Sequence, residues 1–311
     1  MKYIEAKNEK LSFFQLGTVQ LGMTYGIGEH TEKPEKEYAF SILDKAVELG
    51  VNTLDTANNY GDSEAVIGEW LKGVDEKKRP FIITKIGPFD HSTEASLRED
   101  ILSQTMGCIR TLGVDSIDML MVHSYEDYEK NPEAVRKAFF ELKEKGLIRY
   151  TAISAYSDND YKLIASSGFD AVQIPINVFD HSQIENGGIQ ALCDAGMQIF
   201  ARSVFLQGLV FMTPKNLDPR MDFCKPYLEK YIELCREFEM TPEVLAASFV
   251  MSLPGISGLT LGCQTVEQLC QNAEMIDRLS HLTGSQMQKI RSAFLNIDKR
   301  VINPRLWFNH F

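Results

Sequence analysis

The chain has 311 residues, a length typical of either two average domains or a single α/β barrel. Apolar residues make up 44% and charged residues 24% of the sequence, which excludes wholesale disorder and a fibrous repeat. The net charge of −11 repels the phosphate backbone of nucleic acids and the surface of anionic membranes. We therefore expect neither nucleic acid nor a membrane as a partner.

The cysteines and the N-terminal residues indicate the cellular compartment. The 6 cysteines are scattered without a C-x-x-C pair, so we expect no zinc or other metal site and no disulfide framework. Residues 1–10 lack the apolar core of a signal peptide, and no later stretch reaches the roughly 18 consecutive apolar residues of a membrane span. The sequence predicts a cytoplasmic protein.

Short apolar or β-branched runs recur along the chain, and we predict that each is a strand. They lack strict apolar and polar alternation, as expected of parallel strands covered by helices. Between them lie stretches with helical periodicity, such as residues 39–47 and 135–142, each followed by a glycine. The runs lie at residues 11–17, 51–56, 80–86, 116–123, 150–156, 171–177, 197–204 and 258–263.

Alternating strands and helices predict a parallel sheet with right-handed crossovers. Eight such units at this length close most naturally into an α/β fold of the (β/α)8 TIM barrel type, a single domain over residues 1–311. A doubly wound open sheet is the alternative. That fold normally has a G-x-G-x-x-G turn after its first strand, whereas residues 17–22 are G-T-V-Q-L-G.

Two segments stand apart from the regular barrel. Residues 205–231 form the longest stretch without clear periodicity, and we predict an enlarged loop after the seventh strand. Residues 299–311 form a C-terminal tail with Trp307, Phe308 and Phe311, which must pack on something because exposed aromatic side chains are unfavourable in water. The tail could border the active site, cover the barrel or join a subunit interface. The first dozen residues are expected to plug the barrel bottom.

Active sites of such barrels form where strands end and the following loops begin. Asp55 ends the second strand, Lys85 ends the third and His123 ends the fourth, while Tyr60 follows Asp55 by a short loop. Any one of these has an ordinary structural explanation, but four titratable groups at three consecutive strand ends are costly to desolvate unless they pair. We predict that they converge at one mouth of the barrel.

The four side chains form a plausible acid–base set. An ammonium near a tyrosine favours the phenolate, and a carboxylate beside the ammonium keeps it charged. Tyr60 would then donate a proton near neutral pH, and His123 would donate a hydrogen bond to a carbonyl oxygen.

These residues and several flanking motifs resemble the aldo-keto reductase family. The matching motifs are LDTANNYGDSE around Asp55 and Tyr60, ITKIG at Lys85, VHS at His123 and GLTLGCQTVEQLCQN near the C-terminus. The resemblance implies a (β/α)8 barrel that binds NADP(H), with NAD(H) possible, across its C-terminal mouth. It also implies reduction of a small-molecule carbonyl substrate by direct hydride transfer, with Tyr60 as general acid, Lys85 and Asp55 tuning it, and His123 orienting the carbonyl.

The resemblance also implies a set of cofactor contacts. Ser154 and Gln173 would hold the nicotinamide carboxamide. The helix after strand eight, with a predicted Thr265–Gln268 capping box, would hold the pyrophosphate and the 2′-phosphate at its N-terminus. The predicted cofactor-binding residues are Gly17, Thr18, Asp55, Ser154, Gln173, Arg202, Ser203, Phe205, Gln207, Gly208, Gly262, Gln264, Gln268 and Asn272.

The chain departs from the family pattern at three places. Ala155 stands where the family commonly has an asparagine that contacts the carboxamide, and Arg202 stands where an aromatic residue often stacks on the nicotinamide. A guanidinium can also stack on a ring, and we hypothesise that Arg202 favours a substrate with a carboxylate or phosphate. The strand-eight turn lacks the usual basic residues, so we expect NADP(H) with reduced discrimination against NAD(H).

Two other functions stay open at this point. A Schiff-base lyase would use Lys85 as an amine nucleophile, and a regulatory subunit would bind the cofactor with little turnover. Substrate specificity is expected to lie in the loops at residues 25–31, 125–131 and 205–231. The identity of the carbonyl, sugar-like or anionic, and the oligomeric state stay open.

Overall fold

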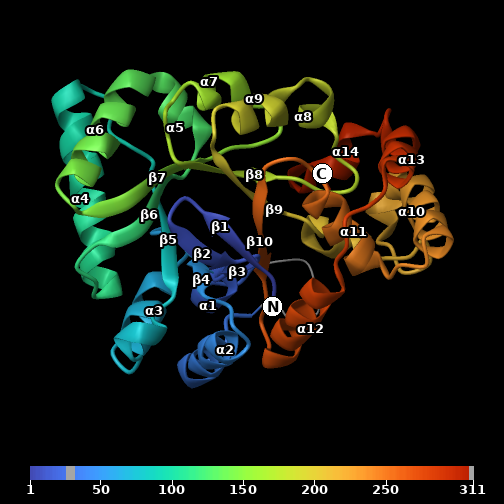
Figure 1. Ribbon diagram of the computed structural model, residues 1–311, viewed down its shortest axis with the longest axis horizontal. Coiled ribbons are helices and arrows are strands. Elements are labelled where there is room, and N and C mark those ends of the chain that lie inside the picture. The colour runs from blue at the N-terminus through green and yellow to red at the C-terminus, as the bar shows by residue number, and fades with distance from the viewer. Residues whose placement is uncertain (26–31, 308–311) are drawn as a thin grey trace.

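Eight parallel strands close into a barrel in the order β10-β3-β4-β5-β6-β7-β8-β9, seen in the computed structural model in Figure 1. The structure describes residues 1–25 and 32–307. The barrel strands are β3 (Phe14–Gly17), β4 (Thr53–Asp55), β5 (Phe81–Ile86), β6 (Ile117–Val122), β7 (Ile148–Ser154), β8 (Ala171–Pro175), β9 (Gln198–Arg202) and β10 (Ile256–Gly262).

Each barrel strand overlaps one of the eight predicted runs, and six strands lie wholly within them, whereas β7 and β10 begin two residues earlier than predicted. The single-domain (β/α)8 barrel is confirmed. The last strand, β10, pairs in parallel with the first, β3, through Leu259–Phe14 and Gly262–Gly17. This pairing closes the sheet, so the doubly wound alternative is wrong. Closure is favoured here because helices cover the outer faces of the strands, and their apolar residues can all be buried.

Helices follow the strands around the outside of the barrel. In α2 the buried residues Ala39, Ile42, Leu43 and Ala46 repeat with the helical period that the sequence showed. No helix in the described part of the chain is long and apolar enough to cross a membrane. The helices are α1 (Val19–Gly22), α2 (Lys36–Glu48), α3 (Ser63–Leu71), η1 (Glu76–Lys78), α4 (Glu94–Leu112), α5 (Tyr125–Lys130), α6 (Pro132–Glu144), α7 (Tyr161–Ala165), α8 (Ser182–Glu185), α9 (Gly188–Asp194), η2 (Leu206–Phe211), η3 (Pro219–Cys224), α10 (Lys225–Glu237), α11 (Pro242–Met251), α12 (Val266–Arg278), α13 (Gly284–Phe294), α14 (Lys299–Ile302) and η4 (Pro304–Leu306).

An N-terminal hairpin closes one end of the barrel. Its strands, β1 (Tyr3–Ala6) and β2 (Glu9–Ser12), pair antiparallel. The hairpin residues Ala6 and Leu11 belong to the same buried cluster as Phe81, Met119 and Phe200 from the barrel interior. The hairpin therefore plugs the bottom of the barrel, as the sequence predicted, and leaves the opposite mouth for the site.

The segment after β9 differs from the predicted loop of residues 205–231. It contains the short helices η2 and η3, and the last seven residues of the predicted loop belong to α10, which begins at Lys225. Pro226 suits the first turn of that helix, and Leu228, Tyr231 and Leu234 are buried at helical spacing. The sequence pattern of α10 was already present inside the stretch that we took as irregular.

The C-terminal tail is partly helical and packs on the body of the protein. Trp307 is 2% exposed and lies in the hydrophobic core, where its indole Nε1 donates a hydrogen bond to the carbonyl oxygen of Arg300 at 2.9 Å. This residue covers the fold and does not border the cavity described below. Phe308 and Phe311 lie outside the described residues.

Candidate active site

Alternation along the strands places the predicted residues at the inner face of the barrel mouth. Ile83 and Met121 belong to the buried cluster inside the barrel. Lys85 and His123 follow them by two positions, and every second residue of a strand points to the same face. The sequence period therefore directs both polar side chains inward.

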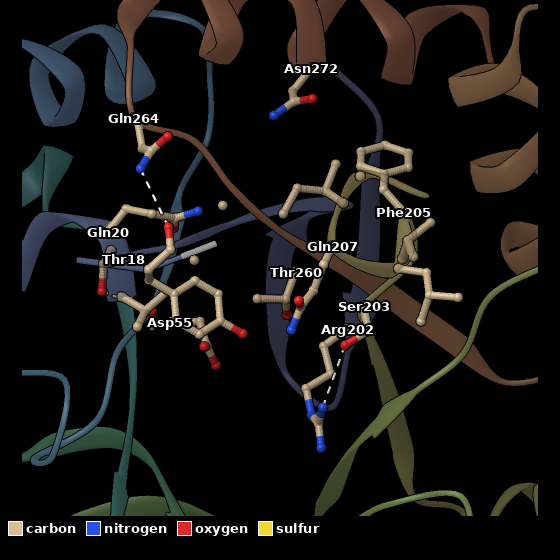
Figure 2. A pocket seen from close by; sticks show the side chains of 18 of the residues that line it. Thr18, Gln20, Asp55, Arg202, Ser203, Phe205, Gln207, Thr260, Gln264 and Asn272 are labelled. Carbon is tan, nitrogen blue, oxygen red and sulfur yellow. Dashed lines mark hydrogen bonds between the residues drawn. The ribbon is translucent and has the colours of Figure 1, made fainter. Parts of the chain in front are cut away.

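A cavity of about 680 Å³ opens at this mouth, shown in Figure 2. Tyr60 and His123 line it, and it extends without interruption to α12. Every predicted cofactor-binding residue also lines it: Gly17, Thr18, Asp55, Ser154, Gln173, Arg202, Ser203, Phe205, Gln207, Gly208, Gly262, Gln264, Gln268 and Asn272. The structure thus brings these residues together around one space, and their binding of a cofactor stays a prediction.

Lys85 and Asp55 form a buried ion pair below this cavity. The Lys85 ammonium donates to Asp55 Oδ1 at 2.7 Å and to the Thr56 carbonyl oxygen at 2.9 Å. The Lys85 side chain is 1% exposed and is absent from the cavity lining. The pair is neutral overall, and its buried position means that each charge depends on the other.

Tyr60 lies between this pair and His123. The Lys85 ammonium is 5.0 Å from the centroid of the Tyr60 ring, and the Tyr60 and His123 rings meet edge to face with centroids 5.6 Å apart. Two glycines make the position possible: a Cβ at Gly22 would lie 1.9 Å from the Tyr60 carbonyl oxygen, and Gly61 has a φ of +59°. Larger residues there would push the Tyr60 loop out of the mouth.

Burial and charge act differently on the two titratable neighbours of Tyr60. Burial works to lower the pKa of Lys85, but the attraction of Asp55 and Tyr60 outweighs it and the pKa is raised. Burial, followed by repulsion from Lys85 and Arg202, lowers the pKa of His123 to about 3. Lys85 is therefore a cation at physiological pH, and His123 is a neutral imidazole that can donate one hydrogen bond.

We expect a His123→Asn variant to gain stability relative to the wild type as the pH falls. An unfolded histidine takes up a proton near its ordinary pKa of 6.5, whereas folded His123 does so only near 3. The wild type therefore loses stability through this window, and the variant does not. Urea unfolding at several pH values should show the difference changing by up to about 1.4 kcal/mol per pH unit. A constant difference would contradict the neutral state.

A chain of hydrogen bonds connects Asp55 to the opposite wall of the barrel. Gln173 Nε2 donates to Asp55 Oδ2 at 2.7 Å and to Thr260 Oγ1 at 3.3 Å. The Thr260 hydroxyl in turn donates to Gln15 Oε1 at 3.1 Å. Both N–H groups of Gln173 are thus engaged, so its predicted contact to a carboxamide has only its carbonyl oxygen left to make.

The backbone after β9 takes an unusual path along the cavity. Ser203, Leu206, Gln207 and Gly208 all have positive φ, between 45° and 92°. Left-handed conformations at residues with a side chain cost about 1 kcal/mol or more each, and such strain gathers at ligand clamps. A right-handed residue followed by a left-handed one, as at Phe205 (φ −97°) and Leu206 (φ 45°), also turns neighbouring N–H groups to one side, which suits an anion. This geometry fits the predicted cofactor contact.

The N-terminus of α12 forms the far end of the cavity, where Gln264 and Asn272 are seen in Figure 2. The Thr265 side chain accepts from the Gln268 N–H as predicted. The Gln268 side chain, however, accepts from the N–H of Gln264 at 2.8 Å, so the predicted reciprocal capping box is wrong. The Gln268 side chain thus satisfies the N–H of the residue that precedes the N-cap Thr265.

Arg202 points into the cavity from the end of β9 (Figure 2). Its guanidinium carbon lies 4.5 Å from the centroid of the Tyr156 ring, and its Nη2 donates to the carbonyl oxygen of Ala155 at 3.0 Å. One face of the guanidinium is therefore covered by Tyr156. Stacking of Arg202 on a nicotinamide, as the sequence predicts, would have to use the opposite face.

Four residues that line the cavity were not singled out from the sequence: Gln20, Tyr156, Thr260 and Gln271. Leu206 and Phe211 also line it, and they lie within the predicted specificity loop of residues 205–231. Thr260 was detectable, since it lies two residues before Gly262 in β10 and shares its inner face.

The structure corrects one of the predicted specificity loops and describes only one residue of another. Residues 125–131 are mainly the helix α5, whose Tyr125 and Tyr128 are buried in the core at helical spacing and do not line the cavity. Of residues 25–31, only Tyr25 is described, and it lines the cavity. Between residues 1–25 and 32–307, no group of three His, Cys, Asp or Glu side chains could hold a metal ion.

Comparison with known proteins identifies the family. The family model of the aldo/keto reductase family matches residues 14–294. The chain belongs to the aldo/keto reductase family. Aldo/keto reductases are oxidoreductases that use a nicotinamide cofactor, and the matched range contains the ion pair, Tyr60, His123 and the whole cavity lining described above.

Relatives of this aldo/keto reductase cover most of its length. An uncharacterized oxidoreductase, YqkF of Bacillus subtilis (strain 168), is 27% identical over 301 residues, covering 89% of this chain and 95% of the relative. An NADH-specific methylglyoxal reductase of Escherichia coli (strain K12) is 21% identical over 299 residues, covering 83% and 89%. The fold is similar to the holo form of aldo-keto reductase AKR11C1 from Bacillus halodurans, with a TM-score of 0.75, 20% identity and coverage of 97% and 100%.

Proposed function

We propose that the protein reduces an aldehyde or ketone to an alcohol, with NADP(H) or NAD(H) as hydride donor and Tyr60 as proton donor. The convergence of Tyr60, His123 and the Lys85–Asp55 pair at one end of a cavity that continues to α12 carries this proposal. The strained backbone after β9 and the N-terminus of α12 fit the phosphates of a dinucleotide.

Each side chain has a definite part in the proposed reaction. The bound cofactor supplies the hydride. Neutral His123 donates a hydrogen bond to the substrate oxygen and orients the carbonyl toward the cofactor. Tyr60 donates the proton to that oxygen, and the Lys85 ammonium stabilises the negative charge that Tyr60 then carries. Asp55 holds the ammonium in place through its 2.7 Å hydrogen bond.

The surroundings of Lys85 disfavour a Schiff-base lyase. An amine nucleophile must be uncharged and reach the substrate, whereas Lys85 is 1% exposed, is absent from the cavity lining and has a raised pKa. Borohydride would trap a substrate on Lys85 only if the protein were a Schiff-base lyase. The regulatory-subunit alternative predicts cofactor binding without carbonyl-dependent turnover.

A carbonyl panel assayed with both cofactors tests the proposal and its cofactor choice. We expect carbonyl-dependent oxidation with NADPH and NADH, with a preference of less than about 10-fold in kcat/KM for NADPH. The reason is that Gln264, Gln268, Gln271 and Asn272 line the α12 end of the cavity, where no described lining residue is Lys or Arg. Charged hydrogen bonds, typically worth about 10-fold each or more, are therefore missing there.

A Gln268→Arg variant should raise the NADPH preference by about 10-fold or more, because it places a cation at the N-terminus of α12. Gln190→Arg makes the same change on the exposed face of α9, away from the cavity, and serves as the matched control. A wild-type preference above about 100-fold for NADPH would contradict the argument from missing charge. Absence of turnover with both cofactors across the panel would overturn the proposed function.

A further inference from the structure

Arg202 is held in a fixed orientation with part of its hydrogen-bonding capacity unused. Tyr156 covers one face at 4.5 Å, the Ala155 carbonyl oxygen accepts from Nη2 at 3.0 Å and the Ser203 hydroxyl accepts from Nη1 at 3.5 Å. Two of its five N–H groups are thereby engaged, and among residues 1–25 and 32–307 both acceptors are uncharged oxygens. The rest of the planar group faces the cavity that it lines.

The charges around the cavity do not balance. Its described lining contains two ionised side chains, Asp55 and Arg202. Asp55 is already neutralised by Lys85 at 2.7 Å, and His123 is uncharged because burial, Lys85 and Arg202 lower its pKa. One positive charge is therefore left in the cavity of a chain whose net charge is −11. A cavity whose charges sum to one cation attracts an anion.

Tyr25 and two phenylalanines complete the surroundings of Arg202. Tyr25 lines the same cavity as Arg202. Phe205 and Phe211 pack against each other with centroids 5.2 Å apart on the wall that follows β9. The cavity thus combines a cation, a tyrosine hydroxyl and an apolar wall beside Tyr60 and His123.

We propose that Arg202, held by Tyr156 and assisted by Tyr25, binds the carboxylate of the substrate, so that the enzyme prefers carbonyl compounds that carry a carboxylate. This inference rests on the proposed carbonyl reduction. The free in-plane edge of the guanidinium matches a planar carboxylate, which can accept two parallel N–H bonds. A single cation neutralises one carboxylate, whereas a phosphate dianion would leave a charge uncompensated. Tyr156 is then a positioning residue for Arg202.

Matched substrate pairs measure the preference independently of the overall rate. The first pair is 4-carboxybenzaldehyde and its neutral methyl ester, methyl 4-formylbenzoate; the second is 4-oxobutanoate and butanal. We expect kcat/KM to favour the carboxylate by about 10-fold or more in at least one pair. Arg202→Gln should bring that ratio close to 1, and Arg202→Lys should retain part of it because the charge stays but the planar fork is lost.

Arg220→Gln provides the matched control, since it removes the same charge from η3, where Arg220 pairs with Asp218 away from the cavity lining. It should retain the wild-type ratio. A wild-type ratio near 1 in both pairs, or a ratio that survives Arg202→Gln, would overturn the inference. So would an equal fall for both members of a pair together with weaker binding of NADH and NADPH, because Arg202 would then serve the cofactor.

Binding measurements separate this inference from the proposed function. If the wild type reduces no carbonyl compound, benzoate and benzamide can be titrated into the protein loaded with NADH and followed by cofactor fluorescence. Tighter binding of benzoate that disappears in Arg202→Gln would support the carboxylate site even though the reductase proposal had failed. Equal binding of the two ligands would overturn the site itself.

Discussion

Replacing Tyr60 with phenylalanine is expected to lower kcat for carbonyl reduction by about 10²- to 10⁴-fold, the range typical of a lost general acid. The change removes only the hydroxyl. The ring should keep its position, because its centroid lies 5.6 Å from the centroid of the His123 ring and 5.0 Å from the Lys85 ammonium. Steady-state oxidation of NADPH or NADH measures the loss. Fluorescence titration should show that the cofactor still binds, which locates the defect in the chemical step.

Tyr3→Phe is the matched control for this variant. Tyr3 lies in β1 at the opposite end of the barrel, where its hydroxyl donates to the Gly50 carbonyl oxygen. Loss of that surface hydroxyl should leave kcat within about 3-fold of the wild type, because surface substitutions away from special features have small effects. If Tyr60→Phe retained turnover to the same degree, Tyr60 would not be the proton donor.

Breaking the buried ion pair should cost about 3 to 5 kcal/mol of unfolding free energy, because Lys85→Met leaves the Asp55 carboxylate buried without its cation. Asp55 is 3% exposed, so solvation by water compensates little for the lost ammonium. The double variant Asp55→Asn, Lys85→Met removes both charges and should recover much of the stability. Its turnover should stay low, since no ammonium then lies beside Tyr60. Urea unfolding and kcat measured on the same variants separate the two effects.

An exposed ion pair gives the reference for this experiment. The Lys36 ammonium lies 2.9 Å from a Glu69 carboxylate oxygen at the surface, with both side chains close to half exposed. Lys36→Met should change the unfolding free energy by less than about 1 kcal/mol, as is usual for solvated pairs. A similarly small effect of Lys85→Met would mean that Asp55 is stabilised by Gln173 alone, through its 2.7 Å hydrogen bond.

Local periodicity in the sequence predicted much of the fold. The apolar runs identified all eight barrel strands, and the parity of residues along them directed Lys85 and His123 inward. Helical spacing predicted the buried faces of α2 and α6. The same rule was available within residues 225–231 and was missed, because η3 and the polar residues before it obscured the start of α10.

Long-range contacts could not be read from any local pattern. Gln173 was expected to bind a cofactor through its amide. Its two N–H groups instead donate to Asp55 and Thr260, which are far from it in the chain. The Gln268 side chain bonds one residue beyond the predicted cap. In both cases the hydrogen-bond partner depends on how separate elements meet in space. A hydrogen bond needs its two heavy atoms within about 3 Å, and the sequence does not say which candidate partner lies that close.

The sequence alone determined the alternation of strands and helices and the residue types at the strand ends, because these follow from periods of two and 3.6 residues that act over a few neighbours. Closure into a barrel was settled by the pairing of β10 with β3. Only the tertiary structure decided that Lys85 lies below the cavity as the buried partner of Asp55, and that Arg202 rests on Tyr156. Closure of the barrel sets these contacts, because burial makes each unpaired charge costly and so determines which side chains pair.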